Sequence, residues 1–380
     1  MNNSATEIAP SKRPSAPVKK EVIIESFEPA ETVFVHHKLD SLLKRINKRH
    51  DFHGSVLVAQ NGKLIYNNHV GLRDFRTKEE IDENSIFQLA SVSKQFTAAA
   101  ILMLAEDLEL HIDDYVTCYY PDFPYEGVTI KHLLNHTAGL PNYFWIAEHK
   151  WKGEQAPTNA EMMDLMETSD VERFFTPGRR FDYSNAAYFV LASIVEQVSK
   201  KSFADFVDEH IFEPLQMNNS YVYSFEHDKI SDNQLIGYRL YRGWRHAKIR
   251  GTVNDAVVGD KNVYSTTEDL LKWVNALNNG DLLSEPYVDM MYSKSENKYG
   301  RKIPYGFGFR INDKGDNNQV YHYGRWNGFS TALTQYPEDD LVVIILEHTS
   351  YNAMTSLNKK IRNIVIDNFE PFEQYTADAE

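Results

Sequence analysis

Hydrophobic residues recur at two different spacings in the first part of the chain. Leu39, Leu42, Leu43 and Ile46 follow a helical period, which predicts a helix over residues 35–50. Two β-rich segments, 54–60 and 63–68, then flank the dipeptide Asn61-Gly62. Asn-Gly between two such segments is a strong signal for a tight hairpin turn. The ordered chain is therefore predicted to begin with a helix and a β-hairpin.

The rest of the chain divides into a helical middle and a β-rich end. Apolar periodicity predicts helices over 93–108, 159–168, 185–200 and 268–277. Short β-rich segments predict strands over 305–311, 319–323, 329–336 and 341–346, before a last helix over about 352–368. The predicted fold class is α/β of the α+β type: one antiparallel sheet, built from both chain ends and flanked by the terminal helices, with a mostly helical region inserted.

This pattern also predicts how the chain is divided. Residues 1–32, rich in Ser, Pro, Ala, Lys and Glu, have the composition of a disordered tail or tether. Residues 33–380 form the predicted folded domain, whose sheet part covers about 33–85 and 300–380 and whose helical part covers about 86–299. A ligand cleft is expected where the two parts meet.

Composition narrows the classes of function. The chain has 54 acidic and 40 basic residues, a formal charge of −14, which argues against a nucleic-acid partner. Its single cysteine, Cys118, excludes an internal disulfide and a cysteine-based zinc cluster, and its apolar neighbours predict a buried thiol. No apolar segment is long enough to span a membrane, and the first residues do not have the pattern of a signal peptide.

The strongest candidate for chemistry is the segment Ser91-Val92-Ser93-Lys94. Residues three apart share a helical face, so the lysine amine can reach the serine hydroxyl. A lysine held away from water loses affinity for its proton and can act as a base. The same Ser-x-x-Lys spacing occurs at Ser41, Ser295 and Ser356, but only Ser91 precedes a strongly apolar helix. We therefore favour Ser91 as a nucleophile and Lys94 as its base.

Two further segments carry groups of the kind that such a serine needs. Tyr183-Ser184-Asn185 supplies a phenol, which could relay a proton if Lys94 lowers its pKa, and an amide that could orient the lysine and the substrate. His322-Tyr323-Gly324 ends a predicted strand, and its glycine would let a substrate approach the backbone.

Taken in order, these segments resemble the signature elements of the serine β-lactamase and penicillin-binding-protein-like family, in its branch of class C β-lactamases, DD-peptidases and esterases. The segments 133–141, around His136, and 259–266, around Asp260, resemble further hallmarks, and the resemblance covers about residues 35–350. The family fold agrees with the split sheet predicted above.

The resemblance implies a role for each matching residue. Ser91 would attack a carbonyl and become acylated, Lys94 and Tyr183 would move the proton, and Asn185 would position Lys94 and substrate. His322 and Gly324 would line the substrate site, and the backbone N–H groups of Ser91 and Arg325 would form an oxyanion hole. No metal or organic cofactor is implied. The partner would be a small-molecule or peptide substrate, such as a D-amino-acid peptide, a small ester or a β-lactam, and the resemblance favours an exported protein; the oligomeric state stays open.

One departure from the family pattern concerns substrate choice. His322 stands where β-lactamases usually have a lysine and Tyr323 where they have threonine, which puts efficient β-lactam hydrolysis in doubt. Two alternatives to a serine hydrolase are a metal hydrolase built on His132 and His136, and an inactive relative that binds peptide or glycan.

Overall fold

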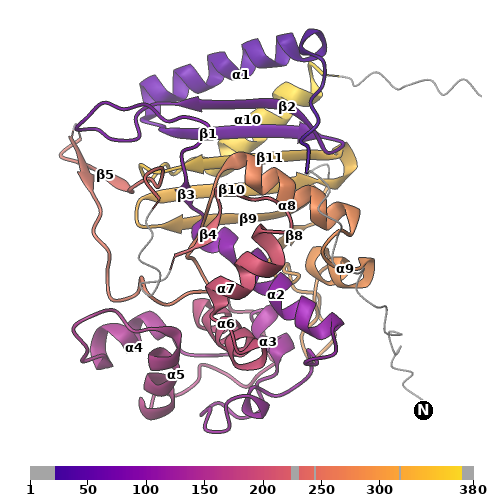
Figure 1. Cartoon of the computed structure of the whole chain (residues 1–380). Helices are drawn as coiled ribbons and strands as arrows, with labels where there is room; N and C mark the ends of the chain where they lie inside the picture. The colour runs from indigo at the N-terminus through magenta and orange to yellow at the C-terminus, as the bar shows by residue number, and fades with distance from the viewer. Residues whose placement is uncertain (1–21, 224–230, 244, 316–317, 370–380) are drawn as a thin grey trace, which may run out of the picture.

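The computed structural model describes residues 22–223, 231–243, 245–315 and 318–369 (Figure 1). A six-stranded antiparallel sheet dominates one half, in the order β2-β1-β11-β10-β9-β8. Its strands are β1 (Gly54–Gln60), β2 (Lys63–Val70), β8 (Arg310–Asn312), β9 (Gln319–Trp326), β10 (Phe329–Tyr336) and β11 (Leu341–Glu347). Because β1 pairs with β11, the two ends of the chain form one sheet, as predicted.

Both faces of the sheet are covered. Successive side chains of a strand point to opposite faces, so Val343 and Ile345 of β11 pack in one core while Val342 and Ile344 pack in the other. The first core lies under α1 (Pro29–His50) and α10 (Met354–Ile366), and the second lies under α8 (Thr267–Asn279) and the helical half. Figure 1 shows α1 along the top edge of the sheet and α8 in front of it.

The helical half is built around two apolar helices, α2 (Lys94–Glu106) and α6 (Asn185–Ser199), which pack against each other. Shorter helices surround them: α3 (Ile130–Leu134), α4 (Tyr143–Lys150), α5 (Asn159–Thr168), α7 (Phe203–Val207) and α9 (Glu285–Tyr292). A small sheet in the order β3-β7-β4 joins Phe87–Gln88, Val263–Ser265 and Tyr221–Val222, and a separate hairpin pairs β5 (Tyr238–Tyr241) with β6 (Arg245–Lys248).

Four details differ from the sequence-based prediction. The first helix begins at Pro29, where Glu28 and Glu31 form a capping box, so the end of the segment 1–32 is helical; residues 1–21 lie outside the described residues. Helices α4 and α9 were not predicted. Only the last two residues of the strand predicted over 305–311 lie in a strand, β8 (Arg310–Asn312), because Gly308 has a φ of 81° and packs against the backbone of α2. Cys118 is exposed, although its apolar neighbours predicted a buried thiol.

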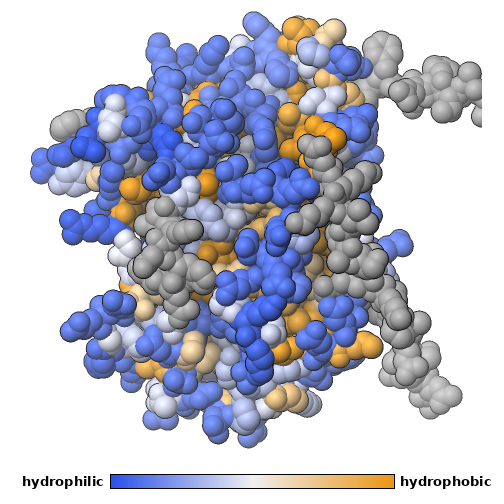
Figure 2. All heavy atoms as spheres, in the orientation of Figure 1, coloured by the Kyte–Doolittle hydropathy of each residue, from blue (hydrophilic) through white to orange (hydrophobic). Residues whose placement is uncertain are grey.

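The surface shown in Figure 2 is mainly hydrophilic, with hydrophobic residues in small separate patches. Among the described residues, no helix combines the length and the apolar character needed to cross a membrane.

Candidate active site

Ser91 lies in a tight turn directly before α2. The turn is a 3₁₀ helix, η1 (Ala90–Ser93), and Lys94 is the first residue of α2. With three residues per turn, side chains at positions i and i+3 of a 3₁₀ segment lie above one another. The Nζ atom of Lys94 is accordingly 3.4 Å from Oγ of Ser91, which stays partly exposed to solvent. The geometry predicted for Ser91 and Lys94 is present.

Lys94 is fully buried and surrounded by oxygen acceptors. Its Nζ donates hydrogen bonds of 2.8 Å to Oδ1 of Asn185 and 2.7 Å to the backbone oxygen of Asp260. Burial lowers the pKa of Lys94 to about 7, with the nearby Arg310 guanidinium lowering it further and the Asp260 carboxylate opposing the shift. A substantial fraction of Lys94 is therefore a neutral amine near neutral pH.

Tyr183 lies against the same lysine, with Lys94 Nζ 5.1 Å from the centre of its ring. Its hydroxyl oxygen is buried and makes no hydrogen bond of normal geometry within the described part of the chain. Burial raises the pKa of Tyr183, while the Ser91 hydroxyl and the Arg310 guanidinium lower it in part. The prediction that Lys94 lowers the pKa of this phenol is wrong, because desolvation outweighs the effect of neighbouring charge. At neutral pH Tyr183 is a proton donor rather than a phenolate.

The residues after Tyr183 are fixed by the start of α6. Ser184 is the N-cap, and its hydroxyl accepts a hydrogen bond from the Ala187 N–H. The Ser184 N–H donates to Nδ1 of His136, and the His136 ring packs on the Tyr183 ring at 4.4 Å. The loop after α3 thus holds the Tyr-x-Asn segment in place.

Strand β9 carries three candidate residues, His322, Gly324 and Arg325, and their surroundings differ. His322 is 1 % exposed, and its ring nitrogens bond to the Tyr305 hydroxyl and the Tyr323 backbone oxygen. Burial, with Lys94 and Arg310 nearby, holds the pKa of His322 well below its usual range, so this side chain is neutral. Arg325 has an exposed side chain at the end of β9.

Gly324 has a packing role. A Cβ atom at this position would lie 2.2 Å from the Leu89 backbone oxygen and 2.3 Å from Oγ1 of Thr331. The space was predicted for an approaching substrate, but the turn that carries Ser91 occupies it. Gly324 therefore lets η1 pack directly on β9 and sets the distance between Ser91 and the strand.

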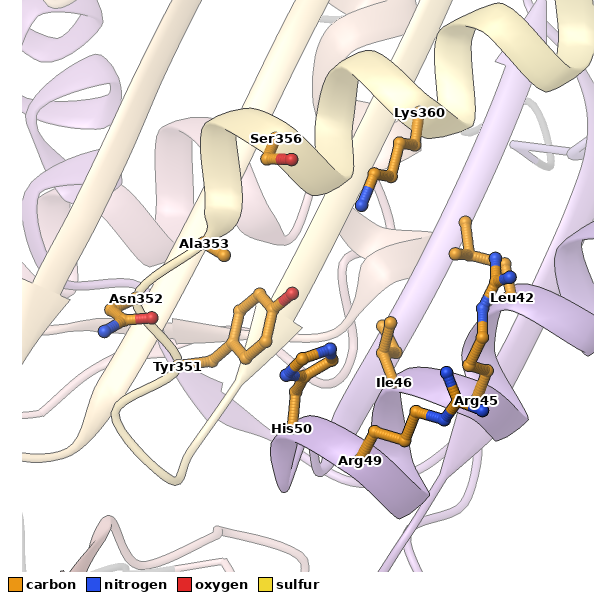
Figure 3. Close-up of a pocket in the computed structure, with 10 residues that line it drawn as sticks. All are labelled: Leu42, Arg45, Ile46, Arg49, His50, Tyr351, Asn352, Ala353, Ser356 and Lys360. Carbon is orange, nitrogen blue, oxygen red and sulfur yellow. The ribbon is translucent and has the colours of Figure 1, made fainter.

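The lysines of the other Ser-x-x-Lys segments, Lys44, Lys298 and Lys359, are exposed, so these segments do not form comparable sites. Ser356 lies on the exposed side of α10, in a pocket of about 560 Å³ between α1 and α10 (Figure 3). The cations of this pocket, Arg45, Arg49 and Lys360, are all exposed, so none has the perturbed environment of Lys94. This pocket is separated from Ser91 by the sheet, because α1 and α10 cover the face opposite the helical half.

The described residues do not support the metal hydrolase. Nδ1 of His136 accepts the Ser184 N–H, and its Nε2 is enclosed by tyrosine rings, so neither nitrogen can join His132 at a metal. Asp51, His53 and His246 do cluster within metal-binding distances. However, Nδ1 of His53 accepts the Leu72 N–H, so its Nε2 carries the proton that it donates to Asp51. The cluster is the Asp51 carboxylate hydrogen-bonded to two histidines, His53 and His246.

Two residues at the site, Arg310 and Lys261, were missed by the sequence-based reasoning. Arg310 stacks on the Tyr183 ring at 4.8 Å, and Lys261 forms a buried pair with Asp260, whose backbone oxygen holds Lys94. The segment around Asp260 resembles a family hallmark, but the sequence does not reveal the contacts of the Asp260 side chain.

Comparison with known proteins relates this chain to β-lactamases and penicillin-binding proteins, in sequence and in structure. The profile of the Beta-lactamase family matches residues 39–365. A penicillin-binding protein of Bacillus subtilis is 32 % identical over 325 residues, covering 82 % of this chain and 71 % of that protein. The crystal structure of a penicillin-binding protein from Bacillus halodurans is similar, with a TM-score of 0.73 and 25 % identity, covering 84 % of this chain and 98 % of the other. An octameric penicillin-binding protein homologue from Pyrococcus abyssi has a TM-score of 0.72 and 27 % identity, covering 86 % and 77 %.

Proposed function

Since the chain belongs to the β-lactamase family, we propose that it is a serine hydrolase that cleaves an amide or ester bond through an acyl-enzyme on Ser91. The fold and the family support the hydrolase class, and the arrangement around Lys94 supports the assignment of the nucleophile and its base.

One observation carries the proposal: the way in which Lys94 is held. A neutral amine has two N–H donors and one lone pair. Two acceptors close to Nζ, Asn185 Oδ1 and the Asp260 backbone oxygen, take the two donors. The lone pair is then left for the third neighbour, the Ser91 hydroxyl at 3.4 Å. With its pKa near 7, Lys94 is a base matched to neutral pH.

The proposed reaction follows from these groups. Ser91 Oγ bonds to the substrate carbonyl carbon as its proton passes to Lys94 Nζ, and the carbonyl electrons move onto oxygen. The intermediate then collapses and the bond to the leaving nitrogen or oxygen breaks. The leaving group takes a proton from Lys94 through the Tyr183 hydroxyl, and water releases the acyl group from Ser91 in the same way.

The edge of β9 is the proposed place for the substrate backbone. Strand β8 pairs with β9 only as far as Tyr321, so within the described chain residues 322–326 have no strand partner on that edge. Backbone N–H groups of Ser91 and Arg325 are proposed to bind the oxyanion, where fixed donors are most effective.

Charge near the site bears on the substrate class. His322 is neutral and offers no positive charge to a substrate carboxylate, whereas Arg310 is a cation beside Tyr183 that forms no ion pair with any carboxylate of the described residues. We favour D-amino-acid peptides or small esters over efficient β-lactam turnover, with a β-lactam as a slow acylating agent.

A labelling experiment tests the proposal. The protein is treated with a fluorophosphonate probe and with a fluorescent penicillin, and turnover is measured with p-nitrophenyl esters, a chromogenic cephalosporin and D-Ala-D-Ala peptides. Ser91→Ala should lose labelling and turnover while melting like the wild type, and the matched control Ser356→Ala should keep both. Labelling that persists in Ser91→Ala would overturn the nucleophile, and a folded wild type that binds peptide or glycan without labelling would favour the binding protein.

A further inference from the structure

A second lysine of the site is buried as deeply as Lys94 but contacts neither Ser91 nor Tyr183. Lys261 is 2 % exposed, and its Nζ lies 3.0 Å from Oδ1 of Asp260, 2.6 Å from the Tyr143 hydroxyl and 3.3 Å from the Val257 backbone oxygen. The rings of Tyr143, Phe144 and Trp326 each lie 5.3 Å from Nζ. An ammonium group with this many fixed partners is held in a single position.

The partner of Lys261 has contacts in two directions. The Asp260 carboxylate, fully buried, accepts hydrogen bonds from Lys261 and, at 3.0 Å, from the Tyr143 hydroxyl. Its backbone oxygen accepts the bond from Lys94. One residue therefore connects the two lysines, with its side chain toward Lys261 and its main chain toward Lys94.

The main chain at this point cannot easily move. Gly259 has a φ of 102°, and a Cβ there would lie 2.5 Å from Cβ of Ala192 in α6. The Gly259 oxygen accepts a 2.6 Å hydrogen bond from Oγ1 of Thr97 in α2. The loop is thus fixed between the two central helices, and a buried carboxylate within it requires a counter-charge.

The charges of this group act on Lys94. The Asp260 carboxylate raises the pKa of Lys94, against the effect of burial. Burial lowers the pKa of Lys261 against the opposing effect of the Asp260 carboxylate, and the charge of Lys94 lowers it further. The other titratable or charged groups that face Lys94 are Tyr183, Tyr188, His136, His322 and Arg310; Asp255 acts on Lys261.

We propose that Lys261 is a positioning residue of this hydrolase, which neutralises the buried Asp260 carboxylate and fixes it, so that the Asp260 backbone can hold Lys94 as a neutral amine toward Ser91. The inference rests on the proposed function and deepens it. Breaking a buried ion pair by removing one partner leaves the other charge uncompensated, so the loss of Lys261 should be felt at Lys94 through Asp260.

The test reads the titration of Lys94 directly. Protein with ¹³Cε-labelled lysine is titrated by NMR, with the Lys94 signal assigned through Lys94→Arg, and the pH dependence of fluorophosphonate labelling is measured in parallel. Lys261→Met should move the Lys94 midpoint upward by about one unit, because an unpaired carboxylate nearby favours the ammonium form. The acid limb of labelling should move with it. Asp260→Asn should move both downward, and the double variant should fall below Lys261→Met.

The outcomes separate this proposal from the proposed function. An unchanged Lys94 midpoint in folded Lys261→Met overturns the role of Lys261, whatever the activity. If Lys261→Met does not fold, Asp260→Asn decides, since a midpoint that does not fall removes the coupling. A wild type without labelling at Ser91 would overturn the proposed hydrolase function. The NMR titration would still test whether Lys261 acts on Lys94 through Asp260.

Discussion

Lys94 and Asn185 stand 91 positions apart in the chain, yet a 2.8 Å hydrogen bond joins Nζ of the lysine to Oδ1 of the amide. The lysine begins α2 and the asparagine begins α6, so the bond ties together the first residues of the two central helices. The contact is neutral on the asparagine side. Lys94 thus gains a fixed acceptor without a carboxylate beside its amine at this point.

The first prediction uses that neutrality. Asn185→Asp has nearly the same shape but places a carboxylate against Nζ, which should raise the pKa of Lys94 from about 7 by about one unit or more. The acid limb of fluorophosphonate labelling should shift to higher pH by the same amount. Asn185→Ala is the control, because it removes the acceptor without adding charge. An acid limb that stays in place in Asn185→Asp would contradict the assignment of Lys94 as the base.

Tyr183→Phe separates catalysis from stability. The Tyr183 hydroxyl is buried and makes no hydrogen bond of normal geometry within the described part of the chain, so its removal should cost little stability. We expect turnover to fall on the order of a hundredfold, the loss typical of a proton-transfer group, while the melting temperature is unchanged or higher. Ester turnover and thermal unfolding of the same preparations check both parts. A variant with normal turnover would remove Tyr183 from the proton path.

Much of the fold could be predicted from the sequence. Ser91, Lys94, Tyr183 and Asn185 could also be predicted as candidate site residues, for a physical reason. The paired segments carry strong local signals, such as the Asn61-Gly62 turn and the apolar period of α2. Lys94 follows Ser91 at a spacing that a helical turn enforces. The prediction that Tyr183 and Asn185 meet Lys94 depended on the resemblance to a family. No local sequence rule indicates that residues from two separate helices lie together.

The remaining features depend on packing that sequence patterns do not contain. Arg310 reaches Tyr183 only because β8 pairs with β9 in one register, with Arg310 opposite Tyr321. The raised pKa of Tyr183 and the neutral state of His322 follow from burial, which a motif does not reveal. The contact of Gly324 with the Ser91 turn is likewise a property of the packed structure.

Glu347, at the end of β11, gives a prediction about stability away from the site. Its carboxylate is fully buried and accepts hydrogen bonds from the Thr349 and Tyr351 N–H groups. Burial raises its pKa to about 8, so the folded protein holds a proton there that the unfolded chain releases above about pH 4.5. This group's contribution to stability is therefore full at low pH and is lost as the pH rises through 8.

Glu347→Gln should remove that pH dependence. The amide loses one hydrogen bond at every pH, so the informative quantity is how the difference in unfolding free energy between variant and wild type changes with pH. We expect the variant to gain on the wild type steadily between pH 5 and 8, in urea unfolding curves at fixed ionic strength. Parallel curves for the two proteins across this range would show that Glu347 does not titrate as described.

Lys94 should itself carry a cost in stability. Its pKa is about 7 in the folded protein and 10.5 in the unfolded chain, so the unfolded chain binds one more proton between these values. Stability from this group is therefore lowest below pH 7, where a charged amine is buried, and it rises with pH up to about 10.5.

Lys94→Met fills similar space without charge, so it should abolish labelling while raising the melting temperature, most at pH 6 and least at pH 10. Lys359→Met, an exposed lysine on α10, is the matched control, in which neither labelling nor melting should change appreciably. A Lys94→Met protein that melts below the wild type at pH 6 would show that hydrogen bonding of the ammonium outweighs its desolvation.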